Sequence, residues 1–136
     1  MNNNLINIIE IIEKNVKNDD FLEIADDYLE EALLEENAFD IVEKLLLLIE
    51  SNPEVDFGNP GPIVHFVEKF YNKGYEEKLL ESIKRVPTLH TLWMLNRIIN
   101  GATGETQVNY IQLMQNIANN EELDEDIRAE ALDFLS

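Results

Sequence analysis

Apolar residues recur along most of this chain at the spacing of an α-helix. Leu5, Ile8, Ile9, Ile12 and Val16 follow an i, i+3, i+4 pattern, which places them on one side of a helix. No stretch shows the convincing alternation of a β-strand. The pattern and its punctuation predict helices over residues 4–17, 21–33, 37–51, 63–72, 75–85, 88–100, 107–118 and 124–135.

One long irregular segment interrupts this pattern. Residues 52–62 hold three of the four prolines and two of the five glycines, a composition that favours neither a helix nor an inner strand. The chain is long enough for one core. We therefore interpret residues 1–136 as a single all-helical domain, in which this loop joins an acidic N-terminal half to a repeat-like C-terminal half.

The expected fold class is all-α, with about eight short helices. Each predicted helix has a single apolar stripe to bury, so the helices must pack pairwise. The second half, with Pro87 opening a helix and a later helix containing DIRAEAL at residues 126–132, resembles HEAT or armadillo repeats. Both a HEAT/armadillo-like α-solenoid and a compact helical bundle fit this pattern, and the solenoid is preferred although the repeats are not cleanly self-similar.

Negative charge is concentrated near the N-terminus. The formal net charge is −18, and residues 1–56 carry 16 acidic and 3 basic side chains. Eleven carboxylates and no Lys or Arg lie between Asp19 and Glu43. Seven of them fall on one side of the predicted helix 21–33 and its N-terminal cap at residues 18–20, opposite the apolar side: Asp19, Asp20, Glu23, Asp26, Asp27, Glu30 and Glu31.

Such a field attracts and orients a basic partner. Like charges at i, i+3 and i+4 repel by a few tenths of a kcal/mol each, and a surface that serves only solubility normally mixes charges of both signs. We therefore predict that these seven carboxylates bind a partner. Phe57, in the irregular loop, is a second predicted contact, although its ring could equally be tucked into the core.

Other functions are disfavoured by what the chain lacks. Clustered Lys and Arg for direct nucleic-acid binding or an anionic membrane surface are missing. No phosphate-binding loop, HExxH, EF-hand or cysteine nucleophile is found, so we expect no enzyme, cofactor, metal or catalytic residue. The absence of cysteines, of a signal peptide and of an apolar run near 20 residues favours a cytoplasmic location.

Two segments carry a family resemblance. They are residues 57–66, FGNPGPIVHF, and residues 87–101, PTLHTLWMLNRIING. Over about residues 55–135 the chain resembles small helical immunity proteins of bacterial polymorphic-toxin and contact-dependent growth inhibition systems. The resemblance implies a cytoplasmic protein that binds and neutralises one cognate toxin domain, commonly a nuclease, whose basic groove would suit an acidic inhibitor.

Two alternatives remain open at the level of sequence. A HEAT-like adaptor would bind a peptide or subunit in a concave groove formed by helices 63–72, 88–100 and 124–135. An acidic DNA mimic would inhibit DNA-binding proteins with carboxylates spaced like duplex phosphates.

Overall fold

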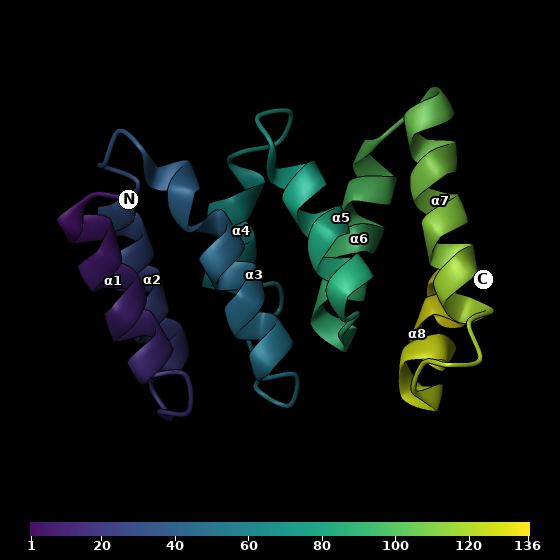
Figure 1. The fold of residues 1–136 in the computed structure, drawn as a ribbon, viewed down its shortest axis with the longest axis horizontal. Helices are drawn as coiled ribbons and strands as arrows, with labels where there is room; N and C mark the ends of the chain where they lie inside the picture. The colour runs from purple at the N-terminus through teal and green to yellow at the C-terminus, as the bar shows by residue number, and fades with distance from the viewer. The chain divides into compact units, whose positions relative to one another are not determined.

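Helices are the only regular elements of this chain. The computed structural model describes residues 1–136 and contains eight α-helices, one 3-10 helix and no strand (Figure 1). The prediction of an all-α fold with about eight short helices is confirmed. The elements are α1 (Asn3–Lys14), α2 (Phe21–Ala32), η1 (Ala38–Ile41), α3 (Val42–Ser51), α4 (Pro62–Glu68), α5 (Tyr75–Arg85), α6 (Leu89–Gly101), α7 (Gly104–Ala118) and α8 (Glu125–Leu135).

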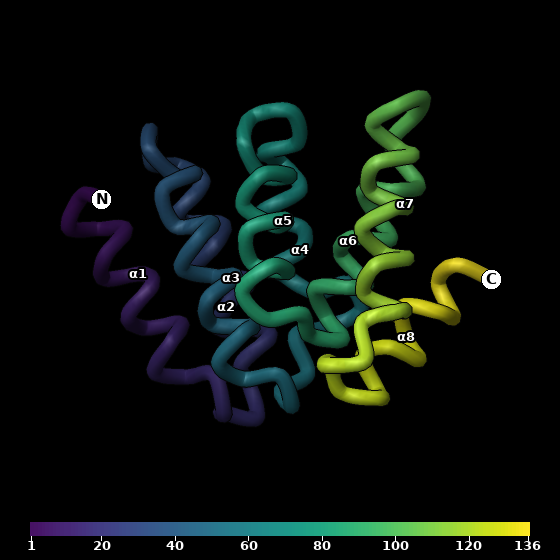
Figure 2. Tube along the Cα trace, turned by 45° about the vertical axis from the view of Figure 1, so that its right-hand side comes forward, coloured from purple at the N-terminus to yellow at the C-terminus, as the bar shows by residue number.

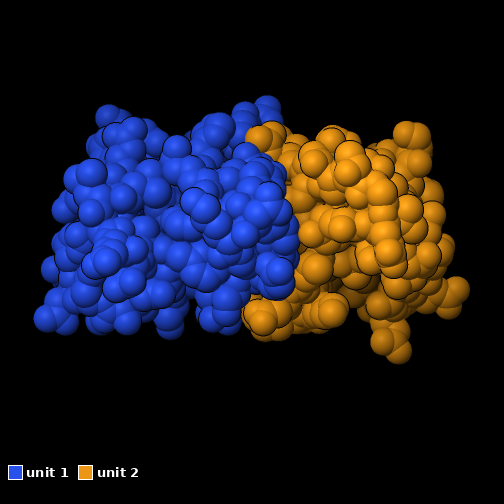
Figure 3. Space-filling model, turned by 90° about the horizontal axis from the view of Figure 1, so that it is seen from above, with its two compact units in different colours: residues 1–78 blue, residues 79–136 orange.

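The chain divides into two compact units, Met1–Lys78 and Leu79–Ser136 (Figure 3). The boundary falls within the uninterrupted helix α5. The irregular loop at residues 52–61, which was expected to join two halves of the chain, lies inside the first unit. The single-domain interpretation and the choice between solenoid and bundle stay predictions.

In the first unit, α2 packs between α1 and α4. Its buried residues, Phe21, Ala25, Leu29 and Ala32, are three or four positions apart and so lie on one side of the helix. Ala25 and Ala32 are fully buried, and their small side chains allow neighbouring backbones to come close. The opposite side of α2 is therefore left to the solvent.

The apolar run of α3, residues 45–49, lies mostly in the core. Leu45, Leu46 and Ile49 are fully buried and Leu48 is nearly so, whereas Leu47 is 36% exposed. The helix predicted over residues 37–51 is divided in two, because the chain passes through η1 before α3 begins. Asn37, the first residue of that predicted helix, precedes η1 and makes no side-chain capping hydrogen bond.

Helix α4 is shorter than its sequence predicts. It begins at Pro62, one residue before its predicted start, and ends at Glu68, four residues early. The chain then turns, and the Phe70 ring packs against Phe66 and Phe39 with ring centroids 5.5 and 5.4 Å away. The early end of α4 thus coincides with the packing of the Phe70 ring against Phe39, which lies outside this helix. Helix α5 begins and ends at the predicted residues.

In the second unit, α6 packs on α7 and α8, and α7 packs on α8 (Figure 2). A buried capping box fixes the start of α6: Thr91 N–H donates to Thr88 Oγ1 at 3.1 Å, and Thr88 N–H donates to Thr91 Oγ1 at 3.0 Å. Helix α7 begins at Gly104, three residues before its predicted start. Gln107 Nε2 donates to Ile99 O at 3.0 Å and ties α7 to α6.

Candidate partner-binding surface

Five of the seven predicted carboxylates lie on α2 itself. They are Glu23, Asp26, Asp27, Glu30 and Glu31, here called the α2 acidic face. All five are exposed, because the other side of the helix is buried against α1 and α4. The structure thus places the larger part of the predicted stripe on one solvent-facing side.

Asp19 and Asp20 precede α2, so their placement within one helical stripe was wrong. The turn before the helix is stabilised by Asn18, whose Oδ1 accepts from Asp20 N–H and whose carbonyl accepts from Phe21 N–H, both at 2.9 Å. Asp20 is the N-cap residue of α2, but its side chain makes no capping hydrogen bond. Both carboxylates remain exposed and adjoin the α2 acidic face.

None of the seven carboxylates forms an ion pair. The salt bridges nearest to them in the sequence join Lys17 to Glu54 and Lys78 to Glu43, and neither includes any of the seven. The negative charge of α2 is therefore compensated only by solvent and counterions. A basic partner would find these oxygens available without first displacing an internal cation.

The acidic face also disfavours the helix that carries it. Asp26 and Glu30, and Asp27 and Glu31, are like-charged pairs at i and i+4, each destabilising by roughly 0.2–0.5 kcal/mol. Glu30 and Glu31 lie in the last turn of α2, which holds no basic residue, and carboxylates there oppose the helix dipole. A cationic partner would relieve both repulsions, so binding and helix stability are coupled.

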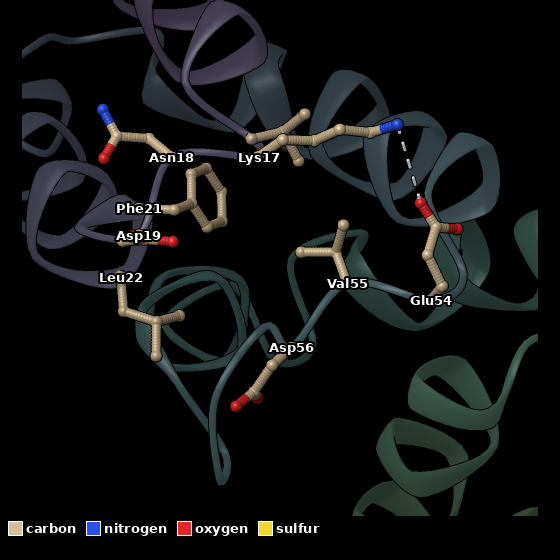
Figure 4. A pocket seen from close by; sticks show the side chains of 9 residues that line it. Lys17, Asn18, Asp19, Phe21, Leu22, Glu54, Val55 and Asp56 are labelled. Atoms are coloured by element: carbon tan, nitrogen blue, oxygen red, sulfur yellow. Dashed lines mark ion pairs between the residues drawn. The ribbon is translucent and has the colours of Figure 1, made fainter.

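A cavity of about 440 Å³ opens beside the start of α2. One side is formed by the turn between α1 and α2 and by the first turn of α2, and the other by the loop after α3 (Figure 4). Lys17 reaches across its upper edge toward Glu54 in that view. We call this the turn–loop cavity, and its lining is Val16, Lys17, Asn18, Asp19, Phe21, Leu22, Glu54, Val55 and Asp56.

The charges of the turn–loop cavity are unbalanced. Its lining residues include three carboxylates, those of Asp19, Glu54 and Asp56, but only one ammonium, that of Lys17. Lys17 Nζ lies 3.9 Å from Glu54 Oε1, and the two side chains are 74% and 64% exposed. Such a long, solvated pair contributes between zero and about 1 kcal/mol. The cavity therefore keeps its negative character and extends the acidic surface beyond α2.

Phe57 does not belong to this surface. Its side chain is 1% exposed and packs edge-on against Phe21, with ring centroids 5.8 Å apart. The predicted partner contact through the Phe57 ring is corrected on this point, and the alternative of a ring tucked into the core describes the structure. Burial of an aromatic ring is strongly favourable, so the loop folds inward around it.

The sequence reasoning missed Glu54, Val55 and Asp56. These residues lie in the loop and meet Asp19 and Leu22 only in the folded chain. Their acid–apolar–acid order just before the buried Phe57 is a signal in the sequence, since a ring anchored in the core holds its neighbours at the surface. The sequence does not indicate which segment lies opposite these loop residues across the cavity.

Two further properties of the chain bear on its chemistry. No group of three or more His, Cys, Asp or Glu side chains is arranged to hold a metal ion. None of the helices combines the length and the apolar character needed to cross a membrane.

Comparison of the chain with protein-family models, with curated proteins and with solved structures finds no match. The functional argument therefore depends on the acidic surface itself.

Proposed function

We propose that this chain is an inhibitor protein that binds a basic protein domain through its acidic surface, in the manner of an immunity protein that neutralises a cognate bacterial toxin. The observation that carries the proposal is the set of seven exposed carboxylates around α2 that form no ion pair. The function is binding rather than catalysis. We expect it to operate in the cytoplasm, where a nuclease toxin would meet its substrate.

Charge complementarity supports a basic nuclease domain as the partner. A nuclease needs clustered Lys and Arg to hold a polyanion, and an acidic protein can cover the same groove. Opposite fields also steer encounter, raising association rates above the ordinary 10⁵–10⁷ M⁻¹s⁻¹ by roughly 10- to 1,000-fold at low salt. Fast capture suits an inhibitor that must act before the toxin does.

The proposal is tested by co-expressing the chain with any toxin-like protein that is encoded directly upstream of its gene. Growth rescue, a 1:1 complex on size exclusion and loss of the toxin's activity in vitro are expected together. Capture of several unrelated DNA-binding proteins would instead support the DNA mimic. Incorporation into a larger assembly without any rescue would support the adaptor.

The role of the surface is tested in the same complex. A variant with Asp19→Asn, Glu23→Gln, Asp26→Asn, Asp27→Asn and Glu30→Gln should keep its helical circular-dichroism spectrum. Its association should slow by roughly tenfold or more at low salt and lose most of its salt dependence. Rescue with an unchanged association rate at low salt would remove α2 from the interface.

A further inference from the structure

The turn–loop cavity combines features that a plain acidic surface lacks. It is concave, and its lining combines apolar residues with carboxylates. We propose that it accepts a Lys or Arg side chain of the basic partner, with the aliphatic stem on the apolar lining and the cation among the carboxylates. This inference rests on the proposed function, since it names an anchor point within that acidic surface.

The apolar lining comes from both sides of the cavity. Val16 and Leu22 contribute from the α1–α2 turn and the start of α2, and Val55 contributes from the loop. All three are half-buried, so each keeps part of its apolar surface available. In Figure 4, Val55 and the Phe21 ring lie on facing sides of the opening. Long basic side chains bury their methylene stems on such surfaces while the charged end stays solvated.

The carboxylates lie around this lining rather than in one row. Asp19 belongs to the turn, whereas Glu54 and Asp56 stand on either side of Val55 in the loop. An incoming cation can therefore meet oxygens from both sides of the cavity. Lys17, already reaching across to Glu54, shows that this edge accommodates an ammonium group.

The loop side of the cavity is held in place. Phe57 anchors it in the core against Phe21. Gly58 N–H donates to Asp56 Oδ1 at 2.9 Å, which fixes the aspartate at the rim. Gly58 and Gly61 have positive φ angles of +106° and +92° and leave no room for a Cβ. A preorganised wall of this kind lowers the ordering cost of binding.

Two peptides separate stem recognition from charge alone. Blocked hexalysine and blocked hexa-(2,4-diaminobutyrate) carry the same six ammonium groups at pH 6, but each side chain of the second lacks two methylenes. Titrated into the ¹⁵N-labelled full chain at low salt, hexalysine should shift amides of residues 16–22 and 54–57. It should bind roughly three- to tenfold more tightly than the shorter analogue.

Matched variants locate the site. A cavity variant carries Asp19→Asn, Glu54→Gln and Asp56→Asn. It removes the same number of negative charges as an α2 variant with Asp26→Asn, Asp27→Asn and Glu30→Gln. Asparagine at position 56 keeps an oxygen for Gly58 N–H. The cavity variant should lose about tenfold in hexalysine affinity and all preference for the longer stem. The α2 variant should keep that preference.

A blocking variant covers the case in which the triple variant fails to fold. Val55→Arg places a basic side chain of the chain itself in the cavity and should abolish the shifts at residues 16–22. Val108→Arg is its control, because Val108 is 61% exposed on α7. It should leave the shifts unchanged.

The outcomes distinguish this inference from the proposed function. Shifts confined to α2, equal affinity for the two peptides or no binding of hexalysine would overturn the cavity as an anchor site. Each of those results leaves the inhibitor function to be decided by growth rescue and the 1:1 complex. Loss of rescue with intact hexalysine selectivity would instead reject the toxin partner and keep the site.

Discussion

A single glycine illustrates how the loop beside the acidic surface is built. Gly61 has a φ of +92°, and a Cβ at this position would overlap the carbonyl oxygen of Phe57. Any other residue must therefore displace the segment that buries the Phe57 ring. Gly101 is a natural contrast, since nothing lies within 4 Å of where its Cβ would be.

We predict that Gly61→Ala destabilises the protein by about 2 kcal/mol, because the left-handed backbone and the overlap both add strain. Gly101→Ala, at the end of α6, should change the stability by less than about 0.5 kcal/mol. Urea unfolding followed by circular dichroism measures both. Equal midpoints for the two variants would show that the loop conformation around Gly61 is not needed for folding.

Phe57 itself gives a second test at the scale of one residue. Phe57→Ala removes a buried ring and should cost about 3–5 kcal/mol. Leu34→Ala, at a leucine that is 84% exposed, should have almost no effect. If instead Phe57→Ala kept full stability and weakened partner binding, the ring would belong to the interface after all.

At the scale of the element, α2 combines a binding surface with an unfavourable charge pattern. Glu31→Lys should stabilise the fold by roughly 0.5–1 kcal/mol, because the new ammonium pairs with Asp27 at i−4 and suits the C-terminal end of the helix dipole. Glu23→Lys makes the same charge change in the first turn, where the acidic residue favours the dipole. New pairing of the introduced ammonium with neighbouring carboxylates of α2 offsets that loss. The stability of the Glu23→Lys variant should therefore change little.

Both substitutions should slow association with a basic partner to a similar extent, because the long-range field depends on charge rather than on helix position. Thermal unfolding and stopped-flow association, measured on the same two variants, separate the two effects. Stabilisation by Glu31→Lys without slower association would mean that this end of α2 lies outside the interface.

The same scale shows what could be predicted from the sequence. Helix α5 was predicted at both ends because Tyr75 follows a glycine and Arg85 precedes Val86 and Pro87. Local signals of this kind suffice for helices and for the exposed side of α2. Local signals do not predict a helix end that depends on residues distant in the sequence. The end of α4 is an example, because Phe70 packs on Phe39 there.

The turn–loop cavity could not be predicted from the sequence for the same physical reason. Its two sides come from residues 16–22 and 54–56, and no periodicity relates segments so far apart. Only the burial of Phe57 against Phe21 brings them together. A site made by tertiary packing of a loop needs the structure to be found.

For the whole molecule, a formal net charge of −18 means that folding works against self-repulsion. Raising NaCl from about 10 to about 100 mM shortens the screening length from roughly 30 to roughly 10 Å, which weakens repulsion among exposed carboxylates. The midpoint of thermal unfolding should therefore rise by about 3–5 °C. Scanning calorimetry at a series of salt concentrations measures the slope.

The variant with Asp19→Asn, Glu23→Gln, Asp26→Asn, Asp27→Asn and Glu30→Gln serves as the control for that slope. It removes part of the repulsion in advance, so it should start from a higher midpoint at low salt and gain less as salt is added. Association with a basic partner should respond in the opposite direction, slowing as the same screening weakens attraction. Parallel salt slopes for the two proteins would show that the charge around α2 does not contribute to the self-repulsion, and the cost assigned to its acidic face would then be wrong.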